Sequence, residues 1–243
     1  MNWLKVMRKQ KQKIFFILFL FINLSGFVTA QSTTPIDSLR KKLTLTTDDS
    51  LKAEINIQLS SEFLYSDNTE ALNYAEKALQ ISDENNLPVQ KGRSYYMIGK
   101  AYRSLGDQNL ALKNFLAGIE IFEKYGLRIR VADGEMLIGS HYYNLKLPDN
   151  AIEYYRKAHD IYSAGKDKSG ESYALNNLGN CYQLKGDYSS AKKYFNQSLK
   201  IDEAQKNSEG MAGSWVNLGT ISIAEKKYAD AENYFNQSLK VYS

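Results

Sequence analysis

Three cationic side chains are the clearest candidates for chemistry in this 243-residue sequence. Arg93 and Lys100 are seven residues apart, and Arg103 follows three residues later. These spacings place all three side chains on one face of a helix. Guanidinium and ammonium groups bind carboxylates through charge-assisted hydrogen bonds. This face is therefore predicted to receive a carboxylate or an acidic segment.

Two amide side chains, Asn176 and Asn180, lie one helical turn apart. Each amide can both donate and accept hydrogen bonds, so the pair could bind a peptide backbone through its N–H and C=O groups. The competing interpretation, for these amides and for the three cations, is an ordinary solvated helix face.

The sequence contains no motif for catalysis. A Gly-rich phosphate loop, a Gly-x-Ser-x-Gly segment and a Cys/His cluster with metal-ligand spacing are all missing. We expect no enzymatic activity within this chain, no cofactor and no metal. His141 and His159 are expected to be solvated or partly packed, and Cys181 to be a small buried thiol. A single cysteine cannot form an internal disulfide, so stability must come from packing.

An internal repeat of 40 residues positions these side chains. The heptad YFNQSLK occurs at 194–200 and again at 234–240, and an apolar-Gly pair recurs at the same interval. Its glycines are Gly99, Gly139, Gly179 and Gly219. Twelve residues after each glycine comes an alanine, then an aromatic residue four later and a small residue three later, as in Ala191, Phe195 and Ser198. Apolar residues at i, i+3, i+4 and i+7 in each half predict two antiparallel amphipathic helices per repeat.

The stretch LGNCYQLKGDYSSAKKYFNQS resembles the tetratricopeptide repeat (TPR) family, although the usual period of that family is 34 residues. The longer period is similar to that in the exported sensor regions of bacterial TPR-containing membrane signalling proteins. The resemblance implies an all-α fold, a right-handed α-solenoid of antiparallel helix pairs. The expected organisation is a signal peptide at 1–30, an N-terminal capping helix at 31–50, a degenerate repeat at 51–91, and four repeats at 92–131, 132–171, 172–211 and 212–243, the last incomplete.

The same resemblance implies a concave groove, lined by the first helix of each repeat, that binds a protein or peptide. The residues assigned to this ligand groove are Arg93, Tyr96, Lys100, Arg103, Tyr143, Asn144, Tyr173, Asn176, Asn180 and Gln183. Further lining positions in the second and fourth repeats are Asp133, Met136, Ser140, Gly213, Val216, Thr220 and Ile223. Asn177 and Asn217 precede the Leu-Gly pair and are expected to serve helix packing.

The first 30 residues predict export. A basic start is followed by an apolar run of about 15 residues and by Val28-Thr29-Ala30, the order of a secretory signal peptide cleaved after Ala30. The alternative is an uncleaved membrane anchor. No second apolar run is long enough to span a membrane after cleavage. Without this segment the chain has 26 basic and 27 acidic residues, which gives no reason to expect nucleic acid as a partner.

Three functions fit these features. The first is an exported interaction module of the periplasm or cell envelope, acting as the ligand-sensing part of a signalling protein. The second is the N-terminal fragment of a membrane-bound histidine kinase or nucleotide cyclase, and the third is a structural scaffold of the cell envelope. The fourth repeat would run to about residue 251 on a 40-residue period, so we expect a fragment or truncated product. The alternative is an open edge that pairs with another chain.

Overall fold

The computed structural model describes residues 34–241, and within this range every regular element is an α-helix. The predicted signal peptide at 1–30 lies outside the described residues. The helices are α2 (Pro35–Leu45), α3 (Asp49–Phe63), α4 (Asn68–Glu84), α5 (Pro88–Leu105), α6 (Gln108–Lys124), α7 (Arg128–Asn144), α8 (Pro148–Ala164), α9 (Lys168–Leu184), α10 (Tyr188–Gln205), α11 (Ser208–Ala224) and α12 (Tyr228–Leu239). None of these helices is long and apolar enough to cross a membrane.

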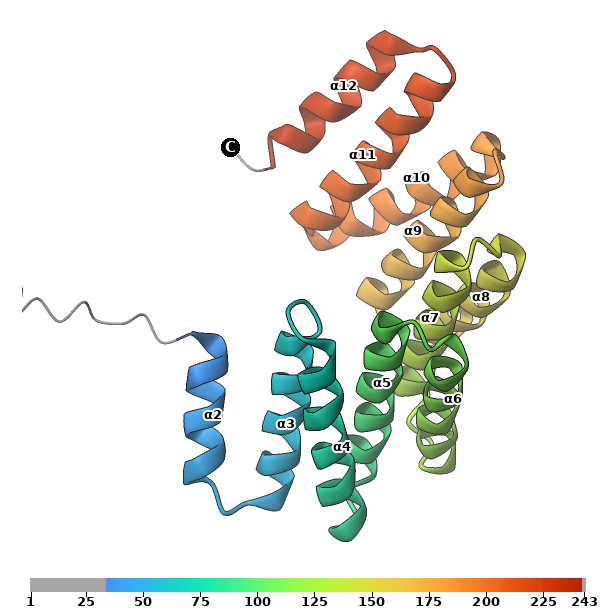
Figure 1. Cartoon of the computed structure of the whole chain (residues 1–243). Helices are drawn as coiled ribbons and strands as arrows, with labels where there is room; N and C mark the ends of the chain where they lie inside the picture. Colours follow the sequence, from blue (N-terminus) through green and yellow to red (C-terminus); the bar gives the residue numbers. More distant parts are fainter. Residues whose placement is uncertain (1–33, 242–243) are drawn as a thin grey trace, which may run out of the picture. The chain divides into compact units, whose positions relative to one another are not determined.

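Within the described residues, the chain from Leu39 onward forms one compact unit that holds α3 to α12. Successive helices run antiparallel and pack as the pairs α3–α4, α5–α6, α7–α8, α9–α10 and α11–α12 (Figure 1). This arrangement confirms the predicted all-α solenoid of helix pairs. Helix α2 crosses the unit boundary after Ser38 and has no buried residue, so its capping role stays a prediction.

The helix starts follow the 40-residue period and are set by local chemistry. First helices begin at Pro88, Arg128, Lys168 and Ser208, four residues before the predicted boundaries at 92, 132, 172 and 212. Pro88 and Pro148 occupy the first turn of their helices, where the missing N–H costs least. Asp107, Asp167 and Asp187 cap other helices by accepting a backbone N–H. The predicted boundaries followed the packing pattern, which begins one turn inside each helix.

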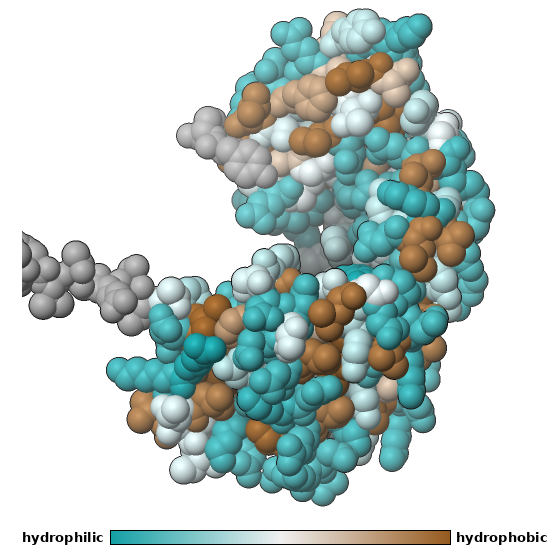
Figure 2. All heavy atoms as spheres, in the orientation of Figure 1, coloured by the Kyte–Doolittle hydropathy of each residue, from teal (hydrophilic) through white to brown (hydrophobic). Residues whose placement is uncertain are grey.

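The core depends on close contacts between small and aromatic residues. A Cβ atom built on Gly139 would lie 2.6 Å from Cδ1 of Tyr155, and one on Gly179 would lie 2.5 Å from Cε1 of Phe195. Tyr155 is 1% exposed and Phe195 is fully buried. The predicted small and aromatic positions are therefore in direct contact within each helix pair. The visible surface is mostly hydrophilic, with separate hydrophobic patches (Figure 2).

We expect Gly139→Ala to lower the free energy of unfolding by about 1–3 kcal/mol, because the added methyl group overpacks against Tyr155. Gly213→Ala is the matched control, since its Cβ would meet nothing within 4 Å in α11. That change should stabilise the protein by up to about 1 kcal/mol through helix propensity. Urea unfolding followed by circular dichroism measures both. Equal effects of the two substitutions would contradict the packing assignment.

Candidate functional site

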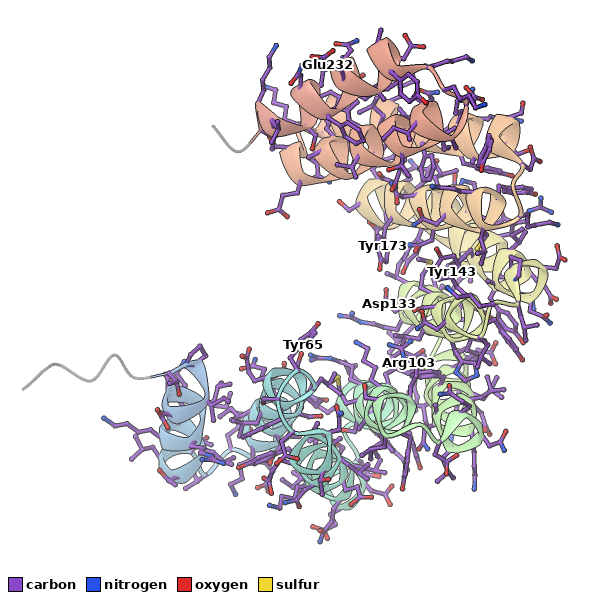
Figure 3. All side chains as sticks on the ribbon, turned by 45° about the horizontal axis from the view of Figure 1, so that its top comes forward. Tyr65, Arg103, Asp133, Tyr143, Tyr173 and Glu232 are labelled. Carbon is purple, nitrogen blue, oxygen red and sulfur yellow. The ribbon has the colours of Figure 1, made fainter. Side chains whose placement is uncertain are left out.

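A groove of about 720 Å³ is lined mainly by α3, α5 and α7, with Tyr173 contributed by α9. We call it the α3–α9 groove. Tyr65, Arg103, Asp133 and Tyr173 lie around the same opening (Figure 3). Of the residues predicted to line a ligand groove, this one contains Arg93, Tyr96, Lys100, Arg103, Tyr173, Asp133, Met136 and Ser140.

The cations of the groove differ in how far their charge is neutralised. Arg93 forms an ion pair with Glu54 of α3. Lys100 has no ion pair among the described residues, and its pKa is lowered by burial and then by the charge of Arg103. Asp133 of the same groove acts in the opposite direction and raises the pKa of Lys100, but neither Lys100 nor Arg103 forms an ion pair within the part of the chain that the structure describes.

Arg103 is held in place by uncharged groups. Its Nη1 donates to Oγ of Ser140 at 3.2 Å, and its guanidinium carbon lies 5.9 Å from the centre of the Phe115 ring. Burial lowers the pKa of Arg103. One hydrogen bond leaves most of its five N–H donors unused, so the guanidinium is oriented and still able to bind an anion.

Exposed aromatic side chains flank the cations. Tyr65, in the turn after α3, is 94% exposed, and Tyr173 is 63% exposed. Met97 and Met136 also form part of the lining, each 6% exposed. Methionine adapts its shape to different partners, and tyrosine rings offer flat apolar surfaces. The groove thus combines positive charge with apolar contact area.

Tyr96 belongs to the core more than to the ligand surface. Its side chain is 6% exposed, and its hydroxyl donates to the carbonyl oxygen of Arg130 at 2.9 Å. A Cβ atom on Gly118 or Gly134 would lie only 2.3 or 2.2 Å from this side chain. Burial raises the pKa of Tyr96, with Asp133 adding to the shift. Tyr96 therefore holds α5 against its neighbours and shapes the wall of the groove.

The two asparagines lie outside the α3–α9 groove and bond to protein groups. Asn176 Nδ2 donates to Oγ of Ser214 at 3.3 Å, while Asn176 Oδ1 accepts from Asn217 Nδ2 at 3.3 Å and from Asn180 Nδ2 at 3.5 Å. Asn176 therefore links α9 to α11, and this link uses its Oδ1 and one of the two N–H donors of Nδ2. Asn177 donates to the Tyr173 carbonyl at 2.9 Å, a bond within its own helix.

The remaining predicted groove residues are also outside this lining. Tyr143 is half-buried, and burial raises its pKa. The ammonium of Lys146 lies 5.7 Å from the centre of the Tyr143 ring. Asn144 is exposed and Gln183 is half-buried. The structure thus brings together the predicted residues of the first repeat and Tyr173, and separates them from the amides of the third.

His141 was expected to be solvated or partly packed, and this was wrong. It is 2% exposed, its ring meets Phe115 and Tyr142 edge-on, and its Nδ1 has no hydrogen-bond partner. Burial, and then the charge of Arg103, lowers its pKa. The sequence does indicate that this position is buried, because the equivalent residues of the other repeats are the apolar Ala101, Cys181 and Ile221. Cys181 is fully buried as predicted, and burial raises its pKa to about 12.

Among the described residues no group of three or more His, Cys, Asp or Glu side chains could hold a metal ion. What the α3–α9 groove offers is a shaped cationic and aromatic surface. Such a surface can form charge-assisted hydrogen bonds with an anion and apolar contacts beside it.

Family models described as tetratricopeptide repeat match residues 130–204, and 92–125 together with 212–243, more than half of the chain. A curated relative, tetratricopeptide repeat protein 29 of Trypanosoma brucei brucei, is 24% identical over 135 residues. That match covers 56% of this chain and 28% of the relative, so the chain spans well under half of the relative's length.

Solved structures share the fold. The apo form of RapI has a TM-score of 0.63 and 19% identity, with coverage of 93% of this chain and 97% of that one. A Rap protein complexed with competence and sporulation factor has a TM-score of 0.68 and 14% identity, with coverage of 85% and 69%. At these identities the likeness concerns the fold alone.

The buried His141 predicts an acid-sensitive fold. Because its pKa is lower in the folded than in the unfolded chain, the unfolded chain takes up a proton first as pH falls below about 6.5. The free energy of unfolding should then fall by up to about 1.4 kcal/mol per pH unit from this residue. His141→Ala should remove that part of the pH dependence, even if the substitution also lowers the free energy of unfolding by the same amount at every pH. Urea unfolding between pH 7.5 and 5 tests this, and the same slope in both proteins would contradict it.

Proposed function

We propose that this chain, which belongs to the tetratricopeptide repeat family, is a protein–protein interaction module that binds an extended polypeptide with an acidic side chain in the α3–α9 groove. The observation that carries the proposal is the Lys100–Arg103 pair, which forms no ion pair with a carboxylate of the described residues and lies in a groove with two exposed tyrosines. The solved complex of a Rap protein with competence and sporulation factor supports the idea, because its fold is similar.

The charges explain why an acidic ligand is favoured over others. A carboxylate placed between Lys100 and Arg103 would relieve their mutual repulsion and form charge-assisted hydrogen bonds in a partly desolvated site. Asp133, on the same groove, disfavours a second acidic group beside it. Tyr65 and Tyr173 then offer apolar surface to the residues on either side. The ligand is therefore an extended segment with one acidic position between apolar or aromatic residues.

We also propose that the module is exported and acts as the ligand-sensing part of a signalling protein. The support is the basic and apolar leader at 1–30, which has the order of a cleavable signal peptide. A sensor needs a site whose occupation it can report, and the α3–α9 groove supplies such a site.

The groove is tested with an unstructured peptide that carries one central Asp between aromatic residues, against the same peptide with Lys at that position. The wild-type chain should bind the Asp peptide more tightly. Arg103→Glu should weaken that binding about 10- to 100-fold, because it removes a hydrogen bond between charged groups and such bonds contribute about that factor to affinity. Lys100→Gln, a milder change, should weaken it in the same direction. Fluorescence anisotropy measures each affinity.

Lys113→Glu on the exposed surface of α6 is the matched charge control for this groove. It should leave the affinity for the Asp peptide unchanged. Equal binding of the two peptides by the wild-type chain, or unchanged affinity in both groove variants, would overturn the assignment.

The export proposal predicts a mature N-terminus at Gln31. Expression of the full chain in a bacterial host should yield periplasmic protein that begins with Gln31, as measured by intact mass and N-terminal sequencing. Ala30→Arg should block the cleavage, because signal peptidase reads small residues at this site. A wild-type product that retains Met1 and remains in the cytoplasm would overturn the proposal.

A further inference from the structure

A second groove, of about 490 Å³, lies between α8 and α10 and shares no lining residue with the α3–α9 groove. We call it the α8/α10 groove. Its floor is apolar, formed by Leu175 and Leu178 of α9, which are 5% and 2% exposed, and by half-buried Ile201. Arg156, Lys193 and Lys200 form a cationic rim around this floor.

The positive charges of the rim outnumber the negative charges that could neutralise them. Lys193 and Lys200 are exposed and have no carboxylate partner among the described residues. Of the two acidic residues of the groove, Glu171 pairs with a lysine outside the lining, whereas Asp160 lies beside a histidine of the lining itself. Oε2 of Glu171 pairs with Lys168 at 2.6 Å, and Oδ1 of Asp160 lies 3.1 Å from Nδ1 of His159. Three cations therefore face one carboxylate, that of Asp160, which has no lysine or arginine partner within the described part of the chain, and the rim carries an excess of positive charge.

Two tyrosine hydroxyl groups orient Arg156 at the edge of this groove. Its Nη2 donates to the Tyr182 hydroxyl at 2.8 Å, and a hydrogen bond with Tyr194 is the main cause of its raised pKa. The rings of Tyr182 and Tyr194 stack with their centres 5.3 Å apart, which fixes both hydroxyl groups. A guanidinium has five N–H donors, so donors remain for an incoming acid.

The repeat provides an internal comparison that isolates this groove. Forty residues earlier, between α6 and α8, the positions of Arg156, Leu175, Lys193 and Lys200 are taken by Leu116, Glu135, Glu153 and Asp160. One repeat earlier, acidic residues therefore stand at the positions of the two lysines. Glu135 stands at the position of Leu175, which belongs to the apolar floor. The sign of the charge is consequently not required by the fold.

We propose that the α8/α10 groove binds an amphipathic helix whose apolar stripe is flanked by acidic residues. A groove with an apolar floor between two helices accepts the apolar face of a third helix. Lys193 and Lys200 are seven residues apart on α10, or roughly 10 Å along its axis, which matches acidic residues at i and i+7 of the ligand. Charge complementarity at the rim selects the acidic partner and fixes its register.

The test uses three synthetic 18-residue helical peptides and the full chain. The first has leucines at i, i+3, i+4 and i+7 with glutamates on both sides of the stripe. The second replaces the glutamates by lysines, and the third replaces the leucines by serines. By fluorescence anisotropy, the first peptide should bind at least 10-fold more tightly than either of the others.

Variants locate the binding. The double substitution Lys193→Glu and Lys200→Glu should reduce the affinity for the Glu-flanked peptide at least 10-fold. Lys41→Glu with Lys42→Glu on exposed α2 changes the net charge equally and should have no effect. Circular dichroism checks that each variant keeps its helices, and the milder Lys193→Gln with Lys200→Gln should act in the same direction.

Several outcomes would overturn the proposal. They are equal binding of the Glu- and Lys-flanked peptides, unchanged affinity in both rim variants, or an equal loss in the α2 variant, which would show attraction to net charge alone. Tighter binding of a single-stranded oligonucleotide than of the Glu-flanked peptide, lost in the rim variants, would assign the groove to nucleic acid instead.

Discussion

The contact between a glycine of each first helix and an aromatic ring of its partner fixes the rest of this structure. Gly99, Gly139, Gly179 and Gly219 face Phe115, Tyr155, Phe195 and Phe235, with no room for a methyl group. Because the aromatic ring lies directly against the backbone, the two helices of a pair have one allowed separation. The first helix then turns its opposite face away from its partner, and that face is where the α3–α9 groove forms. The groove is therefore a consequence of the packing.

A second constraint comes from the turns, which repeat at half the period. Residues with left-handed backbone conformation occur every 20 positions: Asn86, Gly106, Gly126, Lys146, Lys166, Gly186, Lys206 and Lys226. Four of the eight are lysines, for which this conformation costs energy that glycine avoids. The chain tolerates that cost because one residue in this conformation ends each helix and starts the next turn. Helix length is thus set by the turns as strictly as helix separation is set by the glycines.

The sequence predicted what the period determines, and missed what depends on contacts between repeats. Paired helices, small and aromatic contacts and the shared face of Lys100 and Arg103 all follow from residues close together in the chain. Asn176 looked free to bind a peptide because its partners, Ser214 and Asn217, lie 38 and 41 residues away. His141 looked solvated because histidine usually is, whereas its equivalents at other repeats show a buried position. The burial of His141 is thus visible from the equivalent residues of the other repeats, whereas the bonds of Asn176 depend on contacts between repeats.

One position shows how the fold keeps its geometry while its chemistry changes. Phe122 covers Gly92 in the first repeat, and 80 residues later the same pair of positions holds Asp202 and Ser172. Asp202 is 1% exposed, and its carboxylate accepts from Ser172 at 2.7 Å and from Asn207 at 2.9 Å. A buried carboxylate is tolerated only when hydrogen bonds replace its lost water, so both residues had to differ together from the apolar pair. The change at this buried pair is matched, whereas His141 replaces the apolar residues of other repeats without a hydrogen-bond partner for its Nδ1. On the exposed faces no such matching is needed, so the positions of Lys193 and Lys200 hold Glu153 and Asp160 one repeat earlier.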